Sequence, residues 1–111
     1  MTRDSVTDVF PVTILLASSK RRSHRENIML LGRSLLGFLE KNALAKHKLL
    51  REDGSVDDSR DITVADLTPE GAELMNRCLH RWLAYTDRTL KADNTSILEK
   101  ELAKMRADRL P

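Results

Sequence analysis

The feature that most constrains the fold is a helix start in the second half of the chain, Leu67-Thr68-Pro69-Glu70-Gly71. Thr68 is a favourable N-cap residue, Pro69 suits the first helical position, and Glu70 complements the positive end of the helix dipole. Residues at spacings of three and four then follow on one face, and they are Met75, Cys78, Leu79, Trp82 and Thr86. This spacing predicts an amphipathic helix over 69–91 with the only tryptophan on its buried face.

Two further helices are predicted by the same kind of spacing. Ser23 and Glu26 fit a capping box before apolar residues at helical intervals, which predicts a helix over 24–42. Ser96 and Glu99 fit a second capping box, which predicts a last helix over 96–107. The expected core consists of Ile14, Leu16, Leu31, Leu35, Leu39, Met75, Leu79 and Trp82.

Two glycines fall within the first of these helices. Gly32 and Gly37 each weaken a helix by up to about 1 kcal/mol relative to alanine. Either a close approach of another element or simple tolerance explains their presence.

A short β-hairpin is expected between the first long helix and the tryptophan-bearing helix. Residues 61–66 alternate polar and apolar side chains and include β-branched ones, so they favour a strand, with 47–50 as its antiparallel partner. Residues 10–17 fit either a strand or a short buried helix, because a short apolar run does not decide between them. Residues 1–8 are expected to be a loose polar arm. The prediction is a mainly helical (α+β) chain in which 1–111 form one domain of three or more helices with a short hairpin.

The charges are unevenly distributed along the chain. Residues 52–73 carry eight acids and one base, for a net charge of −7, whereas 1–51 carry +6 and 74–111 carry +3. Such an acidic segment is either a solvated loop or a docking surface for a cationic partner. The candidate partner-binding residues are Glu52, Asp53, Asp57, Asp58, Asp61, Asp66, Glu70 and Glu73.

A basic cluster near the first helix is the alternative site. Four positive charges at a helix start suit phosphate groups, and these are Lys20, Arg21, Arg22 and Arg25. Few aromatic residues lie nearby to stack on bases, so a solvated connector is the competing interpretation.

The sequence contains no recognisable catalytic or metal-binding motif. The single cysteine excludes Cys/His zinc spacing, and Cys78 and His80 are two apart on a predicted helix, so they point to different sides. Cys78 is expected in the core and His80 at the surface. Asp57, Asp58 and Asp61 lack the ladder of an EF-hand. We therefore expect no metal, no cofactor and no enzymatic activity.

The longest apolar stretch indicates whether the chain could enter a membrane. Residues 12–17 form that stretch, which Thr13 interrupts, and it is too short to span a membrane. The N-terminus lacks the cationic start and apolar run of a secretory signal, and one cysteine cannot form an internal disulfide. We expect a soluble cytoplasmic protein with no membrane partner.

Three short motifs resemble the wing region of MarR-type winged-helix regulators. They are Leu39-Glu40-Lys41-Asn42-Ala43-Leu44, Asp58-Ser59-Arg60-Asp61 and Leu67-Thr68-Pro69-Glu70-Gly71. The resemblance covers about residues 36–75 and implies a helix–hairpin–helix layout. It makes a winged-helix-like DNA-binding regulator the alternative function, although a wing that reads DNA needs basic residues and this one is acidic.

The size and charge pattern give a second resemblance, of kind and not of motif. A small single domain with a strong patch of one sign is similar to bacterial toxin-neutralising immunity proteins of contact-dependent inhibition systems. That resemblance implies an acidic surface that covers the basic cleft of a nuclease. The function predicted first is therefore non-enzymatic inhibition of a protein partner, most concretely a cationic nuclease toxin, with nucleic acid as an unlikely partner.

Overall fold

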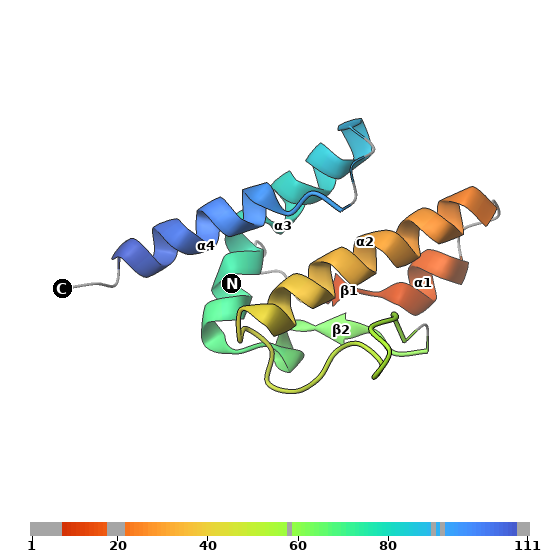
Figure 1. Ribbon diagram of the computed structural model, residues 1–111, viewed down its shortest axis with the longest axis horizontal. Coiled ribbons are helices and arrows are strands. Elements are labelled where there is room, and N and C mark those ends of the chain that lie inside the picture. The colour runs from red at the N-terminus through yellow and green to blue at the C-terminus, as the bar shows by residue number, and fades with distance from the viewer. Residues whose placement is uncertain (1–7, 18–21, 58, 90, 92, 109–111) are drawn as a thin grey trace, which may run out of the picture.

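A computed structural model shows four α-helices and a two-stranded antiparallel sheet within the residues it describes, which are 8–17, 22–57, 59–89, 91 and 93–108 (Figure 1). In chain order the elements are β1 (Asp8–Phe10), α1 (Val12–Ala17), α2 (Arg22–Lys41), β2 (Ile62–Thr63), the 3-10 helix η1 (Val64–Asp66), α3 (Pro69–Thr89) and α4 (Ser96–Asp108). The mainly helical fold class is confirmed.

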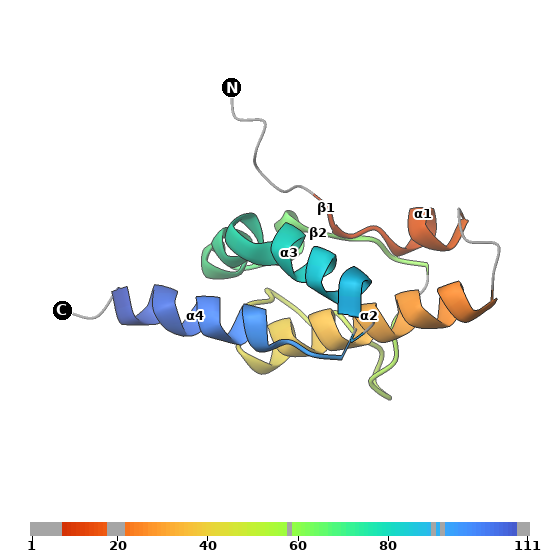
Figure 2. The ribbon, with the colours of Figure 1, turned by 90° about the horizontal axis from the view of Figure 1, so that it is seen from above.

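The elements form two layers around one core. Figure 2 shows α2 and α4 in one layer, with α1, α3 and the strands in the other. Helices α3 and α4 pack against each other, and α1 packs on α2. The buried apolar residues of all the helices form one continuous cluster, as expected when each helix has a single apolar face.

The tryptophan lies at the centre of this core. Trp82 is fully buried, and its indole Nε1 donates a 2.7 Å hydrogen bond to the Asn94 carbonyl in the α3–α4 connection. The predicted core residues are buried apart from Leu31, which is half-buried, and Ile14, whose side chain lies outside the described part of the chain. Burial of such side chains contributes about 1.5–3 kcal/mol each.

The start of α3 is as predicted. Thr68 Oγ1 accepts a hydrogen bond from the Gly71 amide at 3.1 Å, which satisfies one of the free donors at the helix start. The helix runs to Thr89, close to the predicted end at 91.

The two predicted capping boxes are wrong in position. Helix α2 begins at Arg22, so Ser23 lies inside the helix and not before it. Helix α4 begins at Ser96 itself, and the preceding Thr95 hydroxyl donates to the Glu99 carboxylate at 2.6 Å. Helix α2 thus starts two residues before the predicted position 24, whereas α4 starts at the predicted position and only its cap differs.

The predicted hairpin is also wrong. Strand β2 covers only 62–63 and pairs with β1, with Asp8 opposite Thr63 and Phe10 opposite Ile62. The segment expected as its partner, 47–50, forms no strand. Instead, Ala45 and Leu67 form a single antiparallel bridge. Ala45 lies before the segment 47–50, and Leu67 follows η1.

A side chain from α2 explains why the hairpin is not formed. The Glu40 carboxylate accepts hydrogen bonds from the amides of Leu49 and, at 2.7 Å, Leu50. Those two amides are therefore unavailable to a strand. In the other predicted strand, 61–66, the side chains of Thr63 and Asp66 form a capping box, so residues 64–66 adopt the 3-10 helix η1.

Residues 10–17 combine both structures that the sequence left open. Phe10 ends β1, and α1 follows after Pro11. The carboxylate of Asp61 accepts from the Thr13 amide at 2.9 Å and from its hydroxyl at 2.8 Å. This side chain from a distant loop thus caps α1. The predicted arm of 1–8 is wrong at Asp8, which belongs to β1, while 1–7 lie outside the described residues.

The two glycines of α2 differ in their surroundings. A Cβ at Gly32 would collide with the ring of Phe10, so close approach explains that glycine. A Cβ at Gly37 would meet only Leu50 Cδ1, at 3.9 Å, which is ordinary contact.

Candidate functional site

The first part of the acidic segment forms a surface turn over 51–57, which we call the acidic turn. Glu52 and Asp53 are exposed, and Asp53 Oδ1 accepts from the Ser55 amide at 3.0 Å and the Ser55 hydroxyl at 2.6 Å. The Ser55 hydrogen bonds hold the pKa of the Asp53 carboxyl below its ordinary value. The Arg51 amide donates to the Ser55 carbonyl at 2.8 Å and closes the turn. The turn therefore presents ionised carboxylates on an ordered backbone.

Asp57 makes the same kind of local contact. Its Oδ1 accepts from the Ser59 amide at 3.0 Å and the Ser59 hydroxyl at 2.6 Å, and Arg51 lies 3.5 Å away. The Ser59 hydrogen bonds lower the pKa of the Asp57 carboxyl. The next predicted site residue, Asp58, lies outside the described residues.

The later acids of the segment bind other parts of the fold. Glu70 pairs with Arg106 of α4 at 3.0 Å, and that guanidinium also donates to the Asn42 carbonyl at the end of α2. Glu73 pairs with Arg77 one turn further along α3 at 2.7 Å. Asp61, bound to α1, and Glu70, bound to α4, thus join separate elements, whereas Glu73 pairs within its own helix. Three of the eight predicted acids, Asp61, Glu70 and Glu73, therefore have partners elsewhere in the fold.

A cluster of three side chains around Asp66 was not predicted. His47 Nε2 lies 2.8 Å from Asp66 Oδ1, and Arg60 Nη2 lies 3.2 Å from the same oxygen and 3.0 Å from His47 Nδ1. Burial raises the pKa of the Asp66 carboxyl, but hydrogen bonds from the Thr63 amide, His47 and Arg60 outweigh it, so the pKa lies below the ordinary value. The expected neighbourhood of 47–50 and 61–66 was the one signal that could have found this cluster.

The alternative basic patch is only partly described. Arg25 Nη1 donates to the Leu16 carbonyl at 2.9 Å, which satisfies a free acceptor at the end of α1. Lys20 and Arg21 lie outside the described residues, as does the side chain of Arg22. The one described member thus has a structural contact.

An apolar pocket adjoins the acidic turn. Leu30 on α2 is 44% exposed and is the one large apolar side chain exposed among the described residues. It lines a depression of about 320 Å³ together with Met29, Arg33, Asp53, Ser55 and Val56. Sequence analysis missed this pocket because Leu30 falls within an otherwise ordinary helical pattern.

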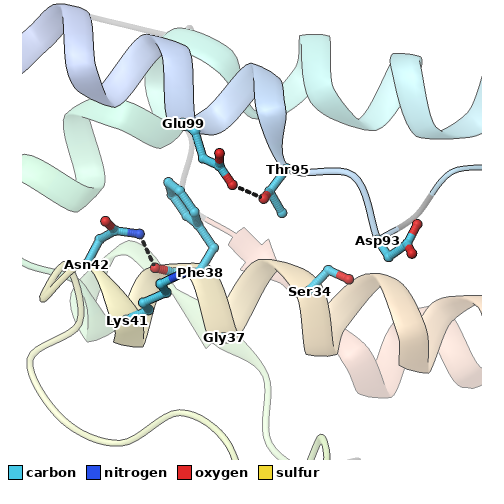
Figure 3. A pocket seen from close by; sticks show the side chains of 8 residues that line it. All are labelled: Ser34, Gly37, Phe38, Lys41, Asn42, Asp93, Thr95 and Glu99. Carbon is cyan, nitrogen blue, oxygen red and sulfur yellow. Dashed lines mark hydrogen bonds between the residues drawn. The ribbon is translucent and has the colours of Figure 1, made fainter.

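A second pocket, of about 430 Å³, lies between α2 and the start of α4 (Figure 3). It is lined by Ser34, Gly37, Phe38, Lys41, Asn42, Asp93, Thr95 and Glu99. Asn42 Nδ2 donates to the Phe38 carbonyl at 2.9 Å, and the Thr95 hydroxyl donates to Glu99. These polar groups therefore help to end α2 and to begin α4.

The cysteine and the histidine of α3 lie apart, as predicted. Cys78 is buried, its Sγ contacts the Leu74 carbonyl, and burial raises the pKa of its thiol to about 11. His80 is exposed. A thiol of this kind is a poor nucleophile at neutral pH.

Metal-ligating and membrane-spanning features were also sought within the described ranges. Those ranges hold no group of three or more His, Cys, Asp or Glu side chains arranged to bind a metal ion. None of their helices has the length and the apolar character needed to cross a membrane.

No protein-family model matches the chain, and no curated protein or solved structure is significantly similar to it.

Proposed function

We propose that this chain is a protein-binding inhibitor without enzymatic activity, most concretely an immunity protein that neutralises a cationic nuclease toxin in the bacterial cytoplasm. The observation that carries the proposal is the ordered turn over 51–57, which presents Glu52 and Asp53 beside the exposed Leu30. Protein interfaces combine an apolar centre with a polar rim, and the ordered turn lowers the entropic cost of binding.

The inhibitory step is occlusion of the nuclease cleft. Carboxylates of the turn occupy positions that nucleic-acid phosphates would take, or they bind basic residues beside the cleft and block it sterically. Exposed acids such as Glu52 would mainly accelerate association, whereas acids that lose their water on binding would slow dissociation.

The test is a binding measurement with the protein encoded by the neighbouring reading frame. We expect a double substitution, Glu52→Lys with Asp53→Lys, to weaken binding by about tenfold or more at low salt, because it reverses two charges that face the partner. Asp87→Lys with Asp108→Lys is the matched control, since both residues are exposed and the change in net charge is the same. Asp61 is left intact because it caps α1.

Two outcomes would contradict the proposal. If the charge-reversed protein is folded and binds its partner as tightly as the control, the acidic turn is not the binding surface. If the neighbouring protein is a nuclease and a stoichiometric amount of the unmodified chain leaves its activity unchanged, inhibition is wrong as well.

The alternative, a winged-helix-like DNA-binding regulator, has less support. Its wing would be the hairpin of 47–50 with 61–66, and the described residues pair 62–63 with β1 instead. A titration on duplex DNA at physiological salt distinguishes the two functions. Sequence-specific binding tighter than about 10⁻⁷ M would favour the regulator, because specific complexes are at least that tight.

A further inference from the structure

The pocket beside the acidic turn combines three properties. Met29, Leu30 and Val56 supply apolar surface, and Asp53 supplies a carboxylate. The two hydrogen bonds from Ser55 both fall on Oδ1 of Asp53. Arg33 adds a guanidinium to the same lining.

These properties restrict the chemistry of an occupant. An entirely apolar side chain would remove water from the Asp53 carboxylate and return no hydrogen bond, which is unfavourable. An acidic group would pair with Arg33 but be repelled by the Asp53 carboxylate of the same lining. A long side chain with an apolar stem and a cationic head matches both the apolar lining and the carboxylate.

Among cationic side chains, arginine fits best. Its planar guanidinium offers parallel donors to a carboxylate, and it is more weakly hydrated than an ammonium group, so it enters a half-enclosed pocket more readily. Arg33 lines the same pocket, and its guanidinium would donate to the main-chain carbonyl of the bound residue.

We propose that this pocket binds an arginine side chain of the partner protein, with the stem on Leu30, Met29 and Val56 and the guanidinium on Asp53. This inference rests on the proposed function, because it specifies which group of a cationic partner is recognised. It adds an anchor in a defined pocket to the exposed charges of the turn.

The test needs no partner protein. We would titrate the ¹⁵N-labelled full chain with N-acetyl-arginine N-methylamide and follow the backbone amides of Leu30, Arg33 and Ser55. The matched probe is N-acetyl-citrulline N-methylamide, which has the same shape but no charge. Saturable shifts at these amides are expected for the arginine probe, with binding of the citrulline probe weaker by about threefold or more.

Variants of the chain assign the binding to the pocket. Asp53→Asn removes the charge and Leu30→Ser removes apolar surface, and each should weaken the arginine probe by about threefold or more. Asp57→Asn is the control, because Asp57 makes the same contacts with Ser59 that Asp53 makes with Ser55 but does not line the pocket. It should leave the affinity within about 1.5-fold, since Asp57 does not line the pocket and its charge is screened by solvent.

Three results would overturn the arginine pocket. They are the absence of saturable shifts, equal binding of the citrulline probe, and shifts of the same amides on concentrating the protein alone, which would assign the pocket to a second copy. If the arginine titration fails while charge reversal at Glu52 and Asp53 still weakens the partner, the inhibitor function stands and the pocket does not. The failures of the two proposals are therefore distinguishable.

Discussion

The two ends of the acidic segment have the same composition and different functions in the fold. Between Glu52 and Asp57 the carboxylates contact serines two residues away and face solvent. Between Asp61 and Glu73 they bind α1, η1, the His47 loop, α4 and the next turn of α3. The first group is available to a partner, whereas the second group has a role in folding.

This difference shows why net charge alone does not define a binding surface. A segment of −7 has that charge in any conformation, but carboxylates that pair with Arg60, Arg77 and Arg106 present little net charge outside the molecule. The comparison predicts that loss of an acid after residue 60 alters stability, while loss of an acid before residue 58 alters binding.

The largest effect on stability is expected at a glycine in the second part of the acidic segment, over 61–73. A Cβ at Gly71 would lie 2.5 Å from the Leu44 carbonyl oxygen, which already accepts from the Thr68 amide. Gly71→Ala should therefore lower the free energy of unfolding by about 3 kcal/mol, despite the better helix propensity of alanine. A Cβ at Gly54, in the first part of the segment, would meet no atom within 4 Å, but Gly54 has φ +85°. Gly54→Ala should therefore lower the free energy of unfolding by about 1 kcal/mol. Urea denaturation of both variants measures the difference.

Asp66→Ala should have the next largest effect. It removes the acceptor for the half-buried Thr63 amide and leaves His47 and Arg60 without their carboxylate, which should cost about 2 kcal/mol. Thermal and urea unfolding would measure it. A stability equal to that of the unmodified chain would mean that Asp66 does not hold this corner of the fold.

Asp61→Ala should cost about 1 kcal/mol, the usual effect of losing a helix cap. The loss should be local, because the carboxylate contacts only Thr13 in the structure described. Amide hydrogen exchange is the appropriate measurement, with faster exchange in α1 and unchanged protection in α3. Uniformly faster exchange would instead show that α1 unfolds only with the whole molecule.

The pH dependence of stability should distinguish the two groups further. The pKa of Asp66 is lower in the folded chain than the ordinary 3.8, so folding favours its ionised form. This contribution is fully present above pH 3.8 and is lost as the pH falls through the folded pKa. The stability difference between the unmodified chain and Asp66→Ala should therefore be constant near neutrality and shrink in acid. A difference that does not shrink would contradict the lowered pKa.

The smallest effect on stability is expected at Asp53. Its carboxylate is exposed and contacts only Ser55 within the turn, so Asp53→Asn should leave the urea midpoint unchanged within error. A marked loss of stability would place Asp53 with the structural acids and remove the contrast between the two groups.

The sequence predicted the parts of the fold that depend on neighbours along the chain. The start of α3 follows from Thr68 and Pro69, and the burial of Cys78 and Trp82 follows from their spacing on one helix. These interactions span a few residues, so periodicity and capping preferences determine them.

The parts that the sequence did not predict depend on side chains that reach across long separations. Glu40 binds the amides of Leu49 and Leu50, and so prevents the expected hairpin. Asp61 reaches Thr13 across 48 positions. The division of the acids between folding and surface likewise depends on where Arg60 and Arg106 come to lie, which no local pattern specifies.

The pairing of β1 with β2 has a consequence for the order of folding. Residues 8–10 meet 62–63 across a long separation in the chain, whereas the hydrogen bonds within each helix and the packing of α3 on α4 are closer in sequence. Closure of a long loop has an entropic cost that the helical part does not share, so the helices can assemble before the first strand docks. Phe10 would then settle over Gly32 as a late step, and the same contact would be among the first to open when the chain unfolds.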